Sequence, residues 1–237
     1  MTPMLTELKE AVYKANLDLI KSGLVILTFG NVSGVDRRRS IVAIKPSGVP
    51  YESLKADDIV LVDFDGNVVE GWLSPSSDTP THIELYKAFP QIGGVAHAHS
   101  PYATMFAQAE KEIPCLGTTH ADLFHGPVPL TRLLVESEVA EGYEKNTGKV
   151  VVERFAGVEP LEVPGALVAG HGPFTWGRTP AEAVETALVL EQVARMALGT
   201  MFLDPGRPPL DPYVLEKHFR RKHGPDAYYG QKKEKDQ

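Results

Sequence analysis

Two histidines separated by one residue, His97 and His99, give the first indication of chemistry in this sequence. They end an apolar segment, Gly93–His99, whose composition is typical of a β-strand. Because residues i and i+2 of a strand point to the same side, both imidazoles could bind a single ion. Taken alone the pair is a weak signal, since histidines also occur as structural core residues.

Two further residues favour a metal site. Asp78 stands at the start of a predicted helix that leads into this strand, and His171 lies between two glycines after another apolar strand, Gly165–Ala169. A histidine in that setting is poorly placed for a core and well placed for a cleft. Three imidazoles, with or without a carboxylate, suit zinc in an open catalytic site. The candidate ligands of one Zn²⁺ per chain are His97, His99 and His171, with or without Asp78.

Three short segments rich in glycine and serine are predicted to form polar turns. Each offers backbone N–H groups or hydroxyl donors, and one adds a lysine, so together they could bind a phosphate group. Each could also be only a turn, and the sequence contains no Walker or dinucleotide-binding fingerprint. The candidate phosphate-binding residues are Gly30, Asn31, Lys45, Ser47, Gly48, Ser76 and Ser77.

The elements that must position these residues follow from hydrophobic periodicity and from turn signals. The predicted helices are Thr6–Lys21, Asp78–Phe89, Tyr102–Glu110, Thr179–Gly199 and Pro212–Lys222. The predicted strands are Leu24–Phe29, Ile41–Ile44, Ile59–Phe64, Asn67–Val69, Gly93–His99 and Gly165–Ala169. We therefore expect a single α/β layered domain over residues 1–237, with a central mixed, largely antiparallel sheet flanked by helices. His82, on the helix after Asp78, is expected to be structural.

Composition excludes several classes of function. The chain has 237 residues, 43% of them hydrophobic and 23% charged, which is typical of a globular domain. A net charge of −7 disfavours nucleic acid as a partner. No apolar run reaches the roughly 18 residues of a membrane span, so we expect no membrane partner. One cysteine, Cys115, excludes an internal disulfide and favours a reduced, cytoplasmic location.

Charge is unevenly distributed along the chain. From Val214 onward there are seven basic and four acidic residues, although the whole chain is acidic. This segment is either a solvated tail or a basic flap that meets a small phosphorylated ligand or a neighbouring subunit.

Several strings give the sequence a resemblance to a known family. They are GNVSGVD, IKPSGV, SSDTPTH, GGVAHAHS, GTTHAD, HGPF and KHFRRKHGPDAYYGQ. In this order they resemble the class II aldolase/epimerase family, which also contains the adducin head, over nearly the whole chain. GTTHAD and the C-terminal string most resemble the sugar-phosphate epimerases of that family.

The resemblance implies a class II aldolase-like fold and assigns roles residue by residue. His97, His99, His171 and Asp78 match the metal site, and the serine- and glycine-rich segments match the phosphate site. Asp122 and Tyr229 resemble the catalytic acid/base pair. Glu144, His218 and Arg221 match positions that line the site from an adjacent subunit. The resemblance thus implies a homotetramer with sites at subunit interfaces, in which the segment of about 211–237 reaches a neighbour.

The implied reaction is zinc-dependent epimerisation at C4 of a phosphorylated ketopentose, in pentose (arabinose) catabolism. Since no carbonyl adjoins C4 to stabilise a carbanion, breaking and re-forming the C3–C4 bond is the expected route, with the metal as a Lewis acid. One alternative is a class II sugar-phosphate aldolase of the fuculose-phosphate type, but Asp78 stands where such aldolases place a glutamate. Another is a non-catalytic interaction module like the adducin head, which has no reason to keep three metal-binding histidines.

Overall fold

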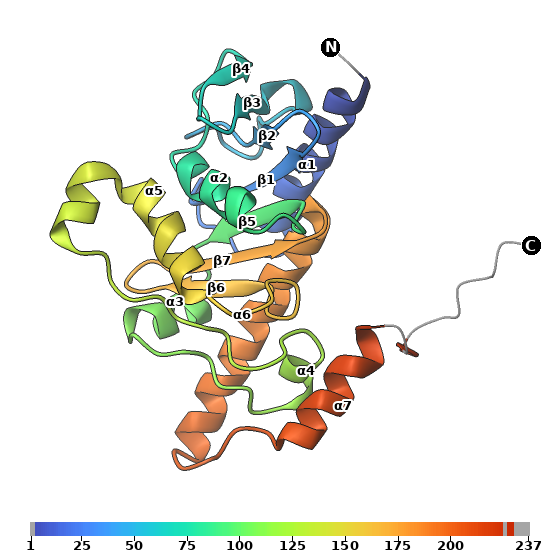
Figure 1. The fold of residues 1–237 in the computed structure, drawn as a ribbon, viewed down its shortest axis with the longest axis vertical. Coiled ribbons are helices and arrows are strands. Elements are labelled where there is room, and N and C mark those ends of the chain that lie inside the picture. Colours follow the sequence, from blue (N-terminus) through green and yellow to red (C-terminus); the bar gives the residue numbers. More distant parts are fainter. Residues whose placement is uncertain (1–2, 225–226, 230–237) are drawn as a thin grey trace, which may run out of the picture.

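The computed structural model describes residues 3–224 and 227–229. A seven-stranded sheet with the order β4-β3-β2-β1-β5-β7-β6 forms its centre, as Figure 1 shows. All neighbouring strands of this sheet pair in the antiparallel sense, and an isolated parallel bridge joins Leu130 to Leu167. The expected layered α/β fold with a largely antiparallel sheet is confirmed.

The bounds of the elements are as follows. The strands are β1 (Gly30–Asp36), β2 (Ile41–Ile44), β3 (Val60–Asp63), β4 (Val68–Glu70), β5 (Gly94–Ala98), β6 (Gly165–Val168) and β7 (Gly172–Gly177). The helices are α1 (Pro3–Lys21), α2 (Thr79–Ala88), α3 (Pro101–Gln108), α4 (Thr118–Ala121), α5 (Glu136–Arg154), α6 (Pro180–Leu203) and α7 (Pro212–Lys222), with a short 3-10 helix at Ala56–Asp58.

Helices cover both faces of the sheet (Figure 1). Ala96 and Ala98 of β5 pack with residues of α1 and α6. Val95 of the same strand belongs to the cluster that contains Tyr86 of α2, and α2 in turn packs against α5. Because side chains alternate along a strand, His97 points to the same side as Val95, toward α2 and α5. The candidate site therefore lies on the α2/α5 face.

Helix α6 would be long and apolar enough, by length and composition alone, to cross a membrane. In the structure it packs against β5 and β7 and also contacts α1 and α3. Ala183, Leu190 and Ala194 of α6 are fully buried. The side of α6 that carries these residues thus belongs to the protein core.

The predicted strand Leu24–Phe29 and the predicted turn that follows it are wrong. Residues 24–29 form an irregular loop, closed by a bridge between Ile26 and Phe29, because Leu27 has a positive φ of 54° that interrupts extended backbone. The strand begins instead at Gly30. A Cβ on Gly34 would lie 2.9 Å from Pro180 Cγ, so this glycine marks close packing of β1 against α6 and not a turn.

The helices α4 and α5, the strand β7 and the short 3-10 helix were not predicted. Gly142 of α5 has a non-helical backbone (φ 158°, ψ 84°) and kinks the helix. At Gly148 a Cβ would lie 2.7 Å from Glu84 Cβ, so the close approach of α2 and α5 requires a glycine. These glycines interrupt the apolar periodicity by which helices are recognised in sequence. The other predicted elements occur with shifts of a few residues at their ends.

Helices α4 and α7 lie against each other at one end of the molecule (Figure 1). Helix α7 is reached through the proline-rich segment 204–209, and its Phe219 is almost fully buried. This arrangement brings the C-terminal segment next to residues 118–122 of the same chain.

Candidate active site

Three imidazoles converge at the ends of two strands. His97 lies on β5, His99 directly follows it, and His171 lies in the turn between β6 and β7. His99 Nε2 is 3.1 Å from His97 Nε2 and 3.1 Å from His171 Nε2. The described residues thus contain a group of three histidine nitrogens within 4.8 Å of one another. The predicted convergence of these residues is confirmed.

The surroundings of His99 and His171 favour neutral rings. Burial lowers the pKa of His171 to about 4, with a further contribution from His97 and His99. Burial, followed by the neighbouring His97, also lowers the pKa of His99. His97 Nδ1 is 2.9 Å from the carbonyl oxygen of Pro173, and its ring stacks on Phe174 with centroids 4.1 Å apart. Neutral imidazoles with their Nε2 atoms turned inward fit a divalent cation well.

Asp78 occupies the N-cap position of α2, but its side chain makes no capping hydrogen bond. Asn31 Nδ2 instead donates to Asp78 Oδ2 at 2.7 Å and to Ser76 Oγ at 3.1 Å. Burial would raise the pKa of Asp78, yet His97, His82 and the Asn31 hydrogen bond together hold it below the usual value. The ionised carboxylate therefore lies beside the histidine group, outside its 4.8 Å cluster.

A cavity of about 580 Å³ joins the metal and phosphate candidates. Asp78, His97, His99 and His171 line it together with the predicted phosphate-binding residues. Those residues are Gly30, Asn31, Lys45, Ser47, Gly48, Ser76 and Ser77. One open cavity is thus lined both by the histidine nitrogens and by a polar wall of hydroxyl and amide groups.

Lys45 is the buried cation of this wall, with 1% of its surface exposed. Its ammonium donates to the Val49 carbonyl at 2.7 Å and lies 4.7 Å from the centre of the Tyr51 ring. Burial lowers the pKa of Lys45 to about 8. Lys45 is therefore mostly charged at neutral pH and can attract an anion.

His82 has the structural setting that we expected. It is fully buried, its Nδ1 lies 2.7 Å from Ser33 Oγ, and Ser33 Oγ is also 2.8 Å from Tyr86 OH. Burial lowers the pKa of His82 to about 3, which keeps the ring neutral. This string of polar side chains ties α2 to β1 beneath the cavity.

The candidate acid/base residues form a second cluster, separate from the cavity of the same chain. Asp122 ends α4 and accepts hydrogen bonds from Arg221 at 2.6 Å and 3.0 Å, while His218 Nδ1 lies 3.0 Å from it. Tyr229 lies with its ring 5.1 Å from the Arg221 guanidinium and 4.4 Å from the Lys222 ammonium. None of these residues lines the cavity that contains the histidines.

The electrostatics of this second cluster keep Asp122 charged. Burial would raise the pKa of Asp122, but hydrogen bonds from Arg221, His218 and Lys222 outweigh it and lower the pKa. The cluster therefore presents a carboxylate and an exposed phenol, Tyr229, on one surface.

Two residues of α5 reach the cavity. Glu144 lines the cavity of its own chain, whereas the family resemblance placed it at the site of a neighbour. Tyr143, which is not among the predicted site residues, also lines the cavity, with its hydroxyl 3.1 Å from His171 Nδ1. No periodicity or motif marks Tyr143, and its position next to Glu144 was the only available signal.

The fold and the histidine site together define a class of protein. The chain matches the Class II Aldolase and Adducin N-terminal domain family over residues 10–198, and it belongs to this family. The family expected from the sequence motifs is thereby confirmed.

Comparison with individual proteins narrows the class. The chain is 57% identical over 226 residues to the L-ribulose-5-phosphate 4-epimerase UlaF of Salmonella paratyphi A (strain ATCC 9150 / SARB42), covering 95% of this chain and 99% of that relative. A solved L-fuculose 1-phosphate aldolase shares its fold with a TM-score of 0.75 and 26% identity, over 90% of this chain and 94% of the other. The L-fuculose 1-phosphate aldolase from Glaciozyma antarctica PI12 has the same TM-score at 19% identity, over 94% of this chain and 84% of the other, and bears on the fold alone.

Proposed function

We propose that this protein is an isomerase that interconverts L-ribulose 5-phosphate and D-xylulose 5-phosphate by epimerisation at C4. The main observation is the single cavity that joins three metal-binding histidines to a polar wall suited to phosphate. The relative at 57% identity is named for this reaction, and the similarity covers nearly the full length of both chains. A cytoplasmic role in pentose catabolism is part of the proposal.

The residues present fit a divalent metal ion. Three imidazole nitrogens face one another, and the carboxylate of Asp78 lines the same cavity. His97, His99 and His171 would hold the ion, Zn²⁺ in this proposal, with Asp78 near it. A cation at this place would supply Lewis-acid stabilisation of the negative charge that develops on the substrate oxygens when the C3–C4 bond breaks.

Side chains of the polar wall would bind and orient the sugar phosphate. Lys45 and the hydroxyl groups of Ser47, Ser76 and Ser77 line the cavity, and they can donate hydrogen bonds to phosphate oxygens. Asn31 has a separate role in binding the substrate. Its side-chain amide nitrogen already donates to Asp78 and Ser76. Its buried Oδ1 has no partner among the described residues and can accept a hydrogen bond from a substrate hydroxyl.

Proton transfer on the two faces of C4 is assigned to Asp122 and Tyr229. Once the C3–C4 bond has broken, rotation of the aldehyde and attack on its other face inverts the configuration at C4. A carboxylate and a phenol can move a proton to or from the C4 oxygen on either side. Both groups belong to the second cluster, which does not line the cavity of the same chain.

The separation of the two clusters supports a site completed by a second copy of the chain. Asp122, His218, Arg221 and Tyr229 would then approach the histidines of a neighbour, in a closed ring of four chains. Large apolar side chains exposed on the described surface support assembly as well. Phe202 and Leu203, at the end of α6, are 86% and 84% exposed.

Incubation with L-ribulose 5-phosphate tests the proposal. We expect D-xylulose 5-phosphate as the product, and in heavy water the product should carry no deuterium at C4, because C4 keeps its hydrogen when the C3–C4 bond breaks. Deuterium at C4, read by NMR, would contradict the bond-cleavage route while leaving the epimerase activity in place.

A sugar-phosphate aldolase is the second candidate function. The shared fold and 26% identity with an L-fuculose 1-phosphate aldolase favour it, since the same metal and phosphate residues could serve cleavage without rejoining. Release of dihydroxyacetone and glycolaldehyde phosphate, or cleavage of another sugar phosphate without epimerisation of L-ribulose 5-phosphate, would establish this alternative.

A further inference from the structure

The hydroxyl of Tyr143 contacts the ring nitrogen of His171 that faces away from the other histidines. Tyr143 OH lies 3.1 Å from His171 Nδ1, while His171 Nε2 faces His99. The two rings stack with centroids 6.0 Å apart and an interplanar angle of 28°. When Nε2 of a histidine binds a cation, Nδ1 keeps its hydrogen and donates it to a partner that fixes the ring. Tyr143 is placed to be that partner for His171.

Tyr143 owes its position to the kinked helix α5. It directly follows Gly142, where the helical backbone is interrupted. Across this kink, Asn146 Nδ2 donates to the Glu138 carbonyl at 2.7 Å. Directly after it, Thr147 Oγ1 donates to the Tyr143 carbonyl at 2.9 Å. The orientation of the Tyr143 ring therefore depends on how the first turns of α5 are held.

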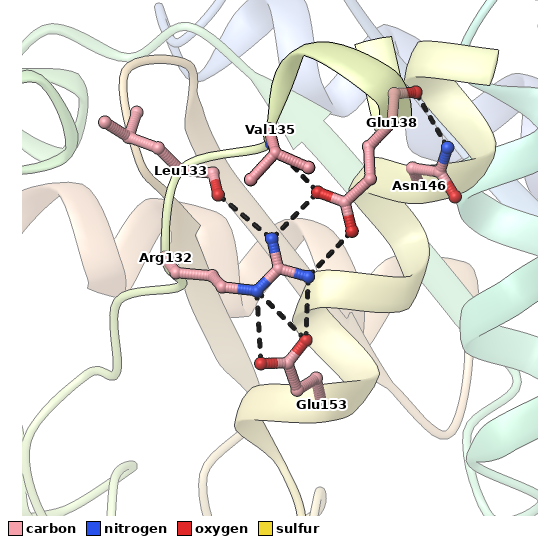
Figure 2. A network of polar contacts seen from close by, with 6 residues as sticks. All are labelled: Arg132, Leu133, Val135, Glu138, Asn146 and Glu153. Carbon is pink, nitrogen blue, oxygen red and sulfur yellow. Dashed lines mark hydrogen bonds and ion pairs between the residues drawn. The ribbon is translucent and has the colours of Figure 1, made fainter. Parts of the chain in front are cut away.

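An arginine holds those turns, as Figure 2 shows. Arg132 donates to both carboxylate oxygens of Glu138, at 2.7 Å and 2.8 Å, and to Glu153 at 3.0 Å to 3.2 Å. Glu138 also accepts from the Val135 backbone at 3.0 Å. We call Arg132, Glu138 and Glu153 the Arg132 clamp. The hydrogen bonds from Arg132 and from the Val135 backbone lower the pKa of Glu138 to about 2, so Glu138 is ionised at neutral pH.

The segment that carries Arg132 also supports the turn that carries His171. The Thr131 backbone donates to the Leu167 carbonyl at 2.9 Å, and Thr131 Oγ1 accepts from the Ala169 backbone at 3.1 Å. The Arg132 clamp thus joins α5 to the same part of the chain from which His171 projects. Both partners of the Tyr143–His171 contact are held by one ionic cluster outside the cavity.

We propose that Tyr143 is a positioning residue for the metal site and that the Arg132 clamp controls metal affinity through it. This inference rests on the proposed metal-binding function of the three histidines. In Tyr143→Phe the ring remains while the hydrogen bond to His171 is lost. In Arg132→Gln the hydroxyl is present but α5 is released from the segment beside His171.

Zn²⁺ affinity, measured by competition with a chromophoric chelator, tests the proposal. We expect Tyr143→Phe to weaken Zn²⁺ binding by about 10- to 100-fold. Arg132→Gln should weaken it by a smaller factor, and the double variant should bind Zn²⁺ no more weakly than Tyr143→Phe alone. A second readout is the visible spectrum of the Co²⁺-loaded protein, which should differ between the wild type and Tyr143→Phe because His171 changes orientation.

Two control variants separate the effect from a general loss of structure. Arg154→Gln removes another ion pair of α5, with Glu112, and should leave Zn²⁺ affinity unchanged. Tyr213→Phe removes the hydroxyl of an exposed tyrosine on α7 and should do the same. Thermal unfolding of each variant checks that it folds.

Three results would overturn the proposal. Unchanged Zn²⁺ affinity and an unchanged Co²⁺ spectrum in Tyr143→Phe would refute the role of Tyr143 while leaving the proposed function intact. An equal effect of Arg132→Gln in the wild-type and Tyr143→Phe backgrounds would refute the coupling through Tyr143. A wild-type protein that binds no divalent ion would overturn both this inference and the metal-dependent function.

Discussion

The histidine site could be predicted from residue types because each histidine carried its own local signal. His97 and His99 have the spacing that places two side chains on one side of a strand, and His171 is flanked by glycines at a strand end. Tyr143 had no such signal, since its contact with His171 depends on a helix kink and on a partner 28 residues away in sequence. Geometry of this kind follows from tertiary packing and cannot be seen in a local pattern.

Lys45 should make sugar-phosphate binding depend on pH. The lysine is charged below its pKa of about 8 and loses its proton above it, so its attraction for phosphate falls as pH rises through 8. The substrate phosphate is already a dianion over this range, since its second pKa is about 6. We expect the KM of the wild type to rise between pH 7 and pH 9.5, whereas Lys45→Met should show a KM raised by about 10- to 100-fold and nearly independent of pH. A flat wild-type profile would contradict the assignment.

Tyr229 and its sequence neighbour Tyr228 offer a matched test of the acid/base proposal. Their side chains are 62% and 64% exposed, so replacing either by Phe should cost little stability. Tyr229→Phe should slow epimerisation by about 10²- to 10⁴-fold, the usual contribution of a general acid or base, and should leave bound metal unchanged. Tyr228→Phe should retain the wild-type rate. Equal rates for the two variants would remove Tyr229 from the mechanism.

Among the helices and strands, the best predicted segments are those in which the apolar residues of the sequence pattern are also the buried residues of the fold. Strands β2, β3 and β5 and helices α2 and α7 lie close to their predicted positions. The predicted strand at residues 24–29 was wrong because Ile26, Leu27 and Phe29 are exposed around a positive-φ backbone at Leu27. Helix α5 was missed because glycines required for packing and for the kink disturb its periodicity.

Gly94 provides a test of how tightly β5 packs against the start of α6. A Cβ at this position would lie 2.4 Å from both Pro180 N and Thr179 O, and backbone atoms cannot easily move away. We expect Gly94→Ala to destabilise the protein by at least about 1–3 kcal/mol, measured by chemical or thermal unfolding.

Gly199 serves as the control, because it lies within α6 and a Cβ there would meet nothing within 4 Å. Gly199→Ala should be neutral or stabilise the fold by up to about 1 kcal/mol through helix propensity. A Gly94→Ala protein as stable as the wild type would show that β5 and α6 are packed less closely than the structure indicates.

At the scale of the whole molecule, the two clusters of the candidate site lie in different parts of one chain. The sequence motifs identified the members of both clusters, but nothing in a single sequence says which chain delivers which cluster. Asp122 and Tyr229 are brought together by α4 and α7, while the three histidines belong to the sheet. Assembly decides whether a cavity uses the Asp122 cluster of its own chain or that of a neighbour, and a local sequence pattern does not encode assembly.

Mixing two inactive variants tests the shared site. His97→Ala removes a metal ligand, and Tyr229→Phe removes a group of the second cluster. If a cavity works with the Asp122 and Tyr229 of a neighbour, subunit exchange between the two variants should restore part of the activity, because some interfaces then combine two intact halves. Verified exchange without any recovery would place both halves in one chain.

Asp122 pairs with Arg221, His218 and Lys222 of α7, in a cluster separate from the histidines. This separation affects how mutant alleles of the gene should behave when two copies are expressed in one cell. With shared sites, a gene copy that encodes a chain damaged only at the histidines still supplies neighbours with an intact Asp122 cluster, so two differently damaged copies can rescue each other. A copy damaged at both clusters silences its own cavity and that of the next chain. Such an allele should behave as dominant-negative in a cell that also carries the wild-type gene, whereas each single lesion should be recessive.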